Sequence, residues 1–187
     1  MAESVQQSAE LESALPQDSA GDRPPVPELD VLFVGAGTCG TLMSCAHYFR
    51  EWNRPVRFVA VDGVGSVTFG GPPGRRMIPG LGTSVTPAIL DASYVDEVVR
   101  VDEADTIRAC PRLAARGFLF GGSTGTVISG AMEWLTVHGS QDLTAVAIAP
   151  DLGERYLDTV DQPNWVVDLY GEDVLLSDEL TTAARSA

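Results

Sequence analysis

Three glycines stand at a spacing that suits the binding of a phosphate group. Gly35, Gly37 and Gly40 follow the apolar stretch Val31–Val34 and precede a segment in which apolar residues recur at helical intervals. A strand, a glycine turn and a helix in this order leave backbone N–H groups unpaired at the start of the helix. Because those donors and the helix dipole both favour an anion, we predict a phosphate site at Gly37–Thr41.

The same spacing also fits a dinucleotide. Gly35-x-Gly37-x-x-Gly40 is the glycine pattern of dinucleotide-binding folds, and Asp62 ends the next predicted strand, where those folds place the acid that binds the ribose. Asp62 comes a little late in the chain for that role, and an Asp at a strand end is often a turn residue. A small NAD-binding module therefore stays open as one interpretation.

Further motifs resemble those of one enzyme family. Gly37–Thr41 (GTCGT) resembles the GTGGT phosphate loop of fold-type II pyridoxal-phosphate enzymes, the cysteine synthase and cystathionine β-synthase family. Gly121–Gly125 (GGSTG) looks like that family's second signature, in which the serine, here Ser123, hydrogen-bonds the pyridine nitrogen of the cofactor. Ile78–Gly82 (IPGLG) is similar to the glycine loop that faces the substrate, and Asp151–Leu157 (DLGERYL) resembles the C-terminal segment.

The resemblance implies pyridoxal 5′-phosphate as cofactor and an amino acid as substrate. Cys39 departs from the family's usual glycine, so its backbone must adopt a conformation that a non-glycine residue tolerates. Taken alone, Ser123 would be a simple helix N-cap, and Arg76 is as compatible with a solvated turn as with an anionic substrate. No catalytic residue and no metal ligand is assigned. The cofactor-binding residues are Gly37, Thr38, Cys39, Gly40, Thr41 and Ser123, and the substrate-binding residues are Gly80, Gly82 and Arg76.

The reaction class also follows from the resemblance. Gly65–Ser84 is similar to the siderophore-type 2,3-diaminopropionate synthases, which implies a transferase or lyase of amino-acid or secondary metabolism. The expected chemistry is β-replacement on an activated serine such as O-phosphoserine, in the manner of either a cysteine synthase or a 2,3-diaminopropionate synthase.

The chain contains no lysine, since all twelve of its basic residues are arginines. In the family, the Schiff-base lysine lies upstream of the phosphate loop, in a segment far longer than the 34 residues that precede Gly35 here. We therefore expect this chain to correspond to the C-terminal half, to hold the cofactor non-covalently and to be inactive alone. Either a partner chain supplies the lysine, or the chain is a non-catalytic relic or partner subunit; a homodimer is the other arrangement to test.

Composition limits the partners and the location. The 187 residues carry a formal charge of −14, which argues against nucleic acid and against an anionic membrane surface. No apolar run reaches membrane-spanning length. Three cysteines without metal-ligand spacing are typical of free thiols in a reducing cytoplasm.

The alternation of elements predicts the fold class. We expect an α/β fold with a three-layer, open parallel sheet, Rossmann-like, resembling the C-terminal portion of fold-type II enzymes. The predicted sheet strands are Val31–Val34, Val56–Val61, Glu97–Val101 and Leu143–Ala149, with a short strand at Phe118–Phe120. The predicted helices are Thr41–Trp52, Ala88–Tyr94, Glu103–Arg116 and Thr124–His138, with a helical turn at Gly153–Leu157. Residues 1–27 are predicted to be a disordered tail, 28–170 the cofactor-binding domain and 171–187 an acidic, weakly ordered tail.

Overall fold

The structure is a computed structural model that describes residues 28–140 and 142–175. The predicted tail at 1–27 lies outside the described residues, as does residue 141 and the part of the second predicted tail from 176 to 187. Within the described part, Val174 is buried and belongs to a cluster of apolar residues beside α5.

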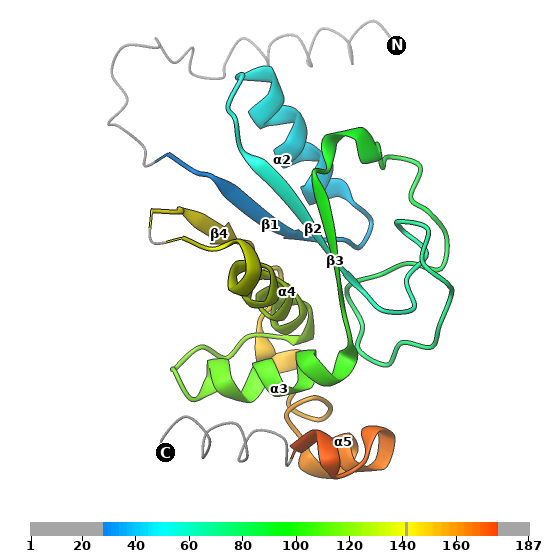
Figure 1. Ribbon diagram of the computed structural model, residues 1–187. Coiled ribbons are helices and arrows are strands. Elements are labelled where there is room, and N and C mark those ends of the chain that lie inside the picture. The colour runs from blue at the N-terminus through cyan, green and yellow to red at the C-terminus, as the bar shows by residue number, and fades with distance from the viewer. Residues whose placement is uncertain (1–27, 141, 176–187) are drawn as a thin grey trace, which may run out of the picture.

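Four parallel strands form the centre of the molecule. They are β1 (Val31–Gly35), β2 (Arg57–Gly63), β3 (Glu97–Val101) and β4 (Ala145–Ala147). The order across the sheet is β3-β2-β1-β4, and each neighbouring pair is parallel (Figure 1). β1 and Phe58–Val61 of β2 are buried, which explains why these stretches are continuously apolar instead of alternating. The prediction of a parallel α/β sheet is confirmed, with β4 shorter than expected.

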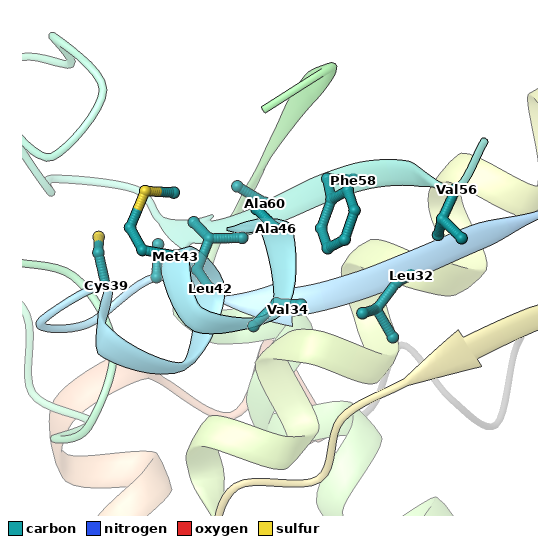
Figure 2. Packing of buried hydrophobic residues seen from close by; sticks show 10 residues of the cluster. Leu32, Val34, Cys39, Leu42, Met43, Ala46, Val56, Phe58 and Ala60 are labelled. Atoms are coloured by element: carbon teal, nitrogen blue, oxygen red, sulfur yellow. The ribbon is translucent and has the colours of Figure 1, made fainter. Parts of the chain in front are cut away.

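Helix α2 (Gly40–Glu51) covers one face of the sheet. Leu42, Met43 and Ala46 recur on one side of the helix because three and four residues make about one turn. Figure 2 shows these side chains against residues of β1 and β2, with Phe58 and Leu32 further along the same face. This layer holds the start of α2 at the end of β1.

Helices α4 (Gly122–His138) and α3 (Glu103–Ala114) lie on the opposite side of the sheet (Figure 1). Trp134 of α4 packs edge-on against Phe33 of β1, with ring centres 5.5 Å apart. A Cβ atom on Gly130 would lie 2.7 Å from Val61, so the helix approaches β2 closely only because that position is glycine. Helix, sheet and helix give the predicted three layers.

Several shorter segments differ from the predictions. Ala88–Tyr94 forms only a 3₁₀ turn, η1 (Ala92–Tyr94), because the Asp91 carboxylate accepts the Ser93 N–H and so competes with α-helix formation. Phe118–Phe120 is not a strand of the sheet; Phe120 makes a single antiparallel bridge to Leu152.

Two further elements lie between residues 153 and 170. The turn predicted at Gly153–Leu157 is η2 (Gly153–Arg155). Helix α5 (Pro163–Tyr170) was not predicted; it starts with a proline, a residue well suited to the first turn of a helix because its missing N–H is not needed there.

Candidate functional site

The parallel arrangement brings three strand ends to one edge of the sheet. β1, β2 and β3 end at Gly35, Gly63 and Val101, and in open α/β sheets ligands bind at this carboxyl edge. The predicted phosphate loop follows β1 directly. The chain then returns to this edge after β2, in the long segment that contains Ile78–Gly82.

Cys39 gives the phosphate loop its shape. Its backbone is left-handed, with φ 63° and ψ 7°, a conformation that non-glycine residues adopt at some cost. The side chain is 2% exposed and points into the apolar layer beneath α2, and its thiol contacts the carbonyl of Gly37 at 3.6 Å (Figure 2). The turn thus buries the one side chain that departs from the family pattern.

The outer side of the same loop offers hydrogen-bond donors. The first helical hydrogen bond runs from the Met43 N–H to the Cys39 carbonyl at 2.9 Å, so the amides of Gly40, Thr41 and Leu42 have no partner within α2. Thr38 and Thr41 are exposed beside them. Two hydroxyls and several free amides suit a phosphate without any basic side chain, so this part of the chain fits the phosphate of pyridoxal phosphate.

Ser123 is the second residue of α4, and it is not the N-cap. Gly121 takes the N-cap position, and Ser123 is 4% exposed. Its hydroxyl lies 3.5 Å from the carbonyl of Pro79, a long hydrogen bond that leaves the group available for another partner. The simple capping explanation for this serine is therefore wrong.

The capping role belongs to Asp151. Its two carboxylate oxygens accept the amides of Ser123 at 3.0 Å and Thr124 at 2.8 Å, and Oδ1 also accepts the Thr124 hydroxyl at 2.7 Å. Burial alone would raise the pKa of Asp151, but hydrogen bonds from Tyr156 and Thr124 outweigh it and lower the pKa. The start of α4 thus already holds an anion, and that anion is part of the chain.

Gly80 links the phosphate loop to Ser123. A Cβ atom on Gly37 would lie 2.9 Å from the Gly80 carbonyl, and one on Gly80 would lie 2.0 Å from the Ser123 hydroxyl oxygen. Both glycines therefore permit close approach, and the φ of Gly80, 109°, also favours glycine. The structure brings together Gly37, Gly80 and Ser123, which belong to three separate predicted motifs.

Gly82 and Arg76 lie deeper in the same loop. The Gly82 amide donates to the Ala36 carbonyl at 2.7 Å, which ties the loop to the end of β1. Arg76 donates to the carbonyl of Gly65 and, at 3.3 Å, to the hydroxyl of Ser84. The guanidinium thus has contacts within the loop, and it also borders a cavity of about 20 Å³, enough for one water molecule. The cavity is lined by Gly63, Arg76, Ile78, Pro79, Leu81, Val101, Glu103, Thr106 and Thr126.

Asp62 does not face the site as a ribose-binding acid would. It is fully buried; one carboxylate oxygen accepts the Gly63 amide at 2.9 Å and the other has no hydrogen-bond partner. Burial is the main reason that its pKa is raised. A carboxylate that no ligand can reach removes the residue on which the dinucleotide interpretation depended.

Three residues of the site were missed by sequence reasoning. Glu103 accepts the amides of Met77 and Ile78, both at 2.7 Å, and so fixes the start of the Ile78–Gly82 loop. Asp151 and Tyr156 lie in the segment that resembles the family's C-terminal motif, yet no role was assigned to either. The motif itself was the available signal for those two. Glu103 lies in Asp102–Ala104 (DEA), which also resembles a family segment, but no role was assigned to it.

Comparison with known proteins agrees with this geometry. Residues 9–151 match the family described as "Pyridoxal-phosphate dependent enzyme". An N-(2-amino-2-carboxyethyl)-L-glutamate synthase from Ralstonia nicotianae is 41% identical over 146 residues, which are 78% of this chain and 42% of that protein. The enzyme of the same name from Cupriavidus metallidurans is 41% identical over 140 residues, or 73% and 41% of the two chains. This chain thus spans about two fifths of the length of these relatives.

Solved structures show the same fold. The O-acetylserine dependent cystathionine beta-synthase from Helicobacter pylori has a TM-score of 0.64 and 27% identity, covering 71% of this chain and 44% of that one. An O-ureido-L-serine synthase has a TM-score of 0.66 and 30% identity, covering 91% and 51%. No helix in the described ranges is both long and apolar enough to span a membrane.

Proposed function

This chain belongs to the family of pyridoxal-phosphate dependent enzymes, and we propose that it takes part in a β-replacement reaction on an activated serine. Pyridoxal phosphate is the family's cofactor and is the cofactor of this chain. When bound, it withdraws electrons from the α-carbon of an amino acid, which allows a group on the β-carbon to leave.

The residues of this chain would bind and orient that cofactor. The amides at the start of α2 and the hydroxyls of Thr38 and Thr41 would hold its phosphate. Ser123 would face the ring nitrogen with a neutral hydroxyl, which keeps the ring a moderate electron sink. Gly80 lies between these two points, and its missing Cβ atom lets the Ile78–Gly82 loop come close to Ser123, so this loop would border the bound cofactor.

The relatives' printed name supports the choice of reaction. A 2-amino-2-carboxyethyl group is an alanine unit attached through its β-carbon, so N-(2-amino-2-carboxyethyl)-L-glutamate contains the skeleton of 2,3-diaminopropionate. In such a step a new C–N bond forms at the β-carbon, the C–O bond to a leaving group such as phosphate breaks, and the attacking amine loses a proton. We propose O-phosphoserine or a similarly activated serine as the substrate and an amino acid as the nucleophile, with a sulfur nucleophile as in cysteine synthases as the second candidate.

The lysine has to come from elsewhere, because none of these 187 residues is lysine. We propose that a separate lysine-bearing chain completes the site in the cytoplasm. The alternative is that the chain binds the cofactor without performing chemistry, as a relic or partner subunit. The NAD-binding alternative loses its support with the burial of Asp62.

A titration tests the proposal. Purified chain is titrated with pyridoxal phosphate while absorbance and intrinsic tryptophan fluorescence are recorded, and the titration is repeated with NAD. We expect saturable binding of pyridoxal phosphate with the absorbance of the free aldehyde, and no response to NAD. Saturable binding of NAD would overturn the proposal. So would the absence of pyridoxal phosphate binding both to the isolated chain and to the chain mixed with its lysine-bearing partner.

A further inference from the structure

The segment after β4, which contains Asp151 and Tyr156, packs against the start of α4. Asp151 and Tyr156 lie five positions apart; Asp151 accepts the Ser123 amide, and the Tyr156 ring lies close to the start of α4. Residues that hold Ser123 determine where its hydroxyl can point. The contacts of the Tyr156 phenol show how far this control extends.

Tyr156 lies against two glycines of α4. A Cβ atom on Gly121 would lie 2.4 Å from the Tyr156 ring, and one on Gly122 would lie 2.9 Å from it. A Cβ on Gly121 would also lie 2.6 Å from the Asp151 carboxylate. The two glycines before Ser123 are therefore needed for the contact with Tyr156 and Asp151, so the two sequence motifs form one structural unit.

The Tyr156 phenol donates its single hydrogen to Asp151. The distance from its oxygen to Asp151 Oδ2 is 2.6 Å, against 3.3 Å to the Pro79 carbonyl. Asp151 Oδ2 also accepts the Ser123 amide at 3.0 Å. Burial first, and Asp151 second, raise the pKa of Tyr156 to about 12, so the phenol keeps its hydrogen at neutral pH.

The same phenol reaches the loop that faces the substrate. Pro79 precedes Gly80, and its carbonyl is approached both by the Tyr156 phenol and by the Ser123 hydroxyl at 3.5 Å. The start of α4 and the Ile78–Gly82 loop therefore meet at the Pro79 carbonyl, and Asp151 holds the Tyr156 phenol beside it. Asp151 accepts the backbone amide of Ser123, and the Ser123 hydroxyl lies beside Tyr156 and the Pro79 carbonyl.

We propose that Tyr156, anchored by Asp151, is the positioning residue of Ser123: it fixes the Ser123 hydroxyl in the orientation that receives the ring of pyridoxal phosphate. This rests on the proposed function. Tyr156 acts through Ser123 and not by direct contact with the cofactor, so its effect disappears once the Ser123 hydroxyl is removed.

A double-mutant cycle on cofactor affinity tests this. The dissociation constant of pyridoxal phosphate is measured for the wild-type chain, Ser123→Ala, Tyr156→Phe and the double variant. We expect each single variant to weaken binding about 3- to 10-fold and the double variant to be no weaker than Ser123→Ala, so that the coupling equals the whole effect of Tyr156→Phe, about 3- to 10-fold. Tyr170→Phe is the matched control, because Tyr170 also donates to a carboxylate, that of Glu103 at 2.7 Å, but is not in contact with Ser123. Its effect should add to that of Ser123→Ala.

Two further results distinguish a failure of this proposal from a failure of the proposed function. Inorganic phosphate, which needs only the α2 loop, should bind all four chains equally, so a general loss of phosphate binding in Tyr156→Phe would reveal mere unfolding and count against the proposal. Additive effects in the cycle, or unchanged affinity in Tyr156→Phe, would overturn the role of Tyr156 while leaving the proposed function intact. A wild-type chain that binds inorganic phosphate but no pyridoxal phosphate would overturn both.

Discussion

The backbone of Gly80 lies directly against the hydroxyl of Ser123, so that a Cβ atom at position 80 would stand 2.0 Å from the serine oxygen. The two residues are 43 positions apart in the chain, and neither belongs to a strand of the sheet. Their contact depends on the close packing of the loop after β2 against the start of α4. Several consequences for stability and binding can be measured.

Gly80→Ala should be more destabilising than an alanine at a glycine with a similar backbone. Left-handed conformation alone costs an alanine about 1–2 kcal/mol, and the clash with Ser123 adds about 1–3 kcal/mol. Gly70 is the matched control, since its φ is 72° and a Cβ atom there would meet nothing within 4 Å. Urea unfolding of both variants gives the two free energies, and equal losses would show that the contact at Ser123 is not close.

Thr38→Val and Thr41→Val should each weaken the binding of inorganic phosphate. Removing one hydroxyl donor to an anion costs about 1 kcal/mol, or roughly a fivefold increase in the dissociation constant. Ser44→Ala is the control, because Ser44 is an exposed hydroxyl on α2 beyond its first turn. Isothermal titration of the three variants checks this, and a similar loss in Ser44→Ala would place the phosphate elsewhere.

Borohydride reduction in the presence of pyridoxal phosphate should leave the mass of the isolated chain unchanged. A stable adduct requires a primary amine, and in the absence of lysine the α-amino group of Met1 is the only one in the 187 residues. Intact-mass spectrometry measures the outcome. A stoichiometric adduct would contradict the prediction and point to Met1, whereas an adduct on an added lysine-bearing partner would favour a completed enzyme over a relic.

Asp151→Asn should reduce the dependence of stability on acid pH. Because the folded-state pKa of Asp151 lies below its ordinary value of 3.8, the unfolded chain binds the proton first as pH falls. The carboxylate therefore contributes stability above that value, and the contribution is lost as pH falls through the lower, folded-state pKa. Thermal unfolding between about pH 5 and about pH 2 should show a flatter profile for the variant.

Asp91→Asn is the comparison for that experiment. Asp91 also has a lowered pKa, chiefly through its hydrogen bonds with Ser93, but it is exposed at a short 3₁₀ turn. Its removal should leave the profile close to that of the wild type, because exposed groups at such turns contribute little to global unfolding. An identical flattening in both variants would show that Asp151 contributes no more to the pH dependence of stability than the exposed Asp91.

The sequence predicted the elements whose signals are local. Val31–Val34, the glycine turn and the apolar spacing of α2 are adjacent in the chain, so the strand, the turn and the helix could be inferred without knowledge of distant contacts. β3 was predicted with its observed bounds for the same reason. The strand β2, whose centre Phe58–Val61 is apolar, was also predicted, with a shift of one or two residues at its ends.

The details that were missed depend on distant residues. The helix predicted at Thr124–His138 starts two residues earlier, at Gly122, where Asp151, 28 residues after Ser123, accepts the amides of the first turn. The strand predicted at Phe118–Phe120 has no neighbour in the sheet and pairs only through Phe120 with Leu152. Local pattern could not reveal either contact, because each requires the position of the segment after β4.

The carboxylate of Asp151 also gives the ligand site a direction. Helices α2 and α4 start near the same edge of the sheet, and both starts carry partial positive charge, but that of α4 is already neutralised from within. Under the proposed function, a molecule with a single phosphate would be attracted at the start of α2 and not at the start of α4. The distribution of charge would then orient an elongated ligand with its phosphate toward α2, independently of the contacts that recognise its ring.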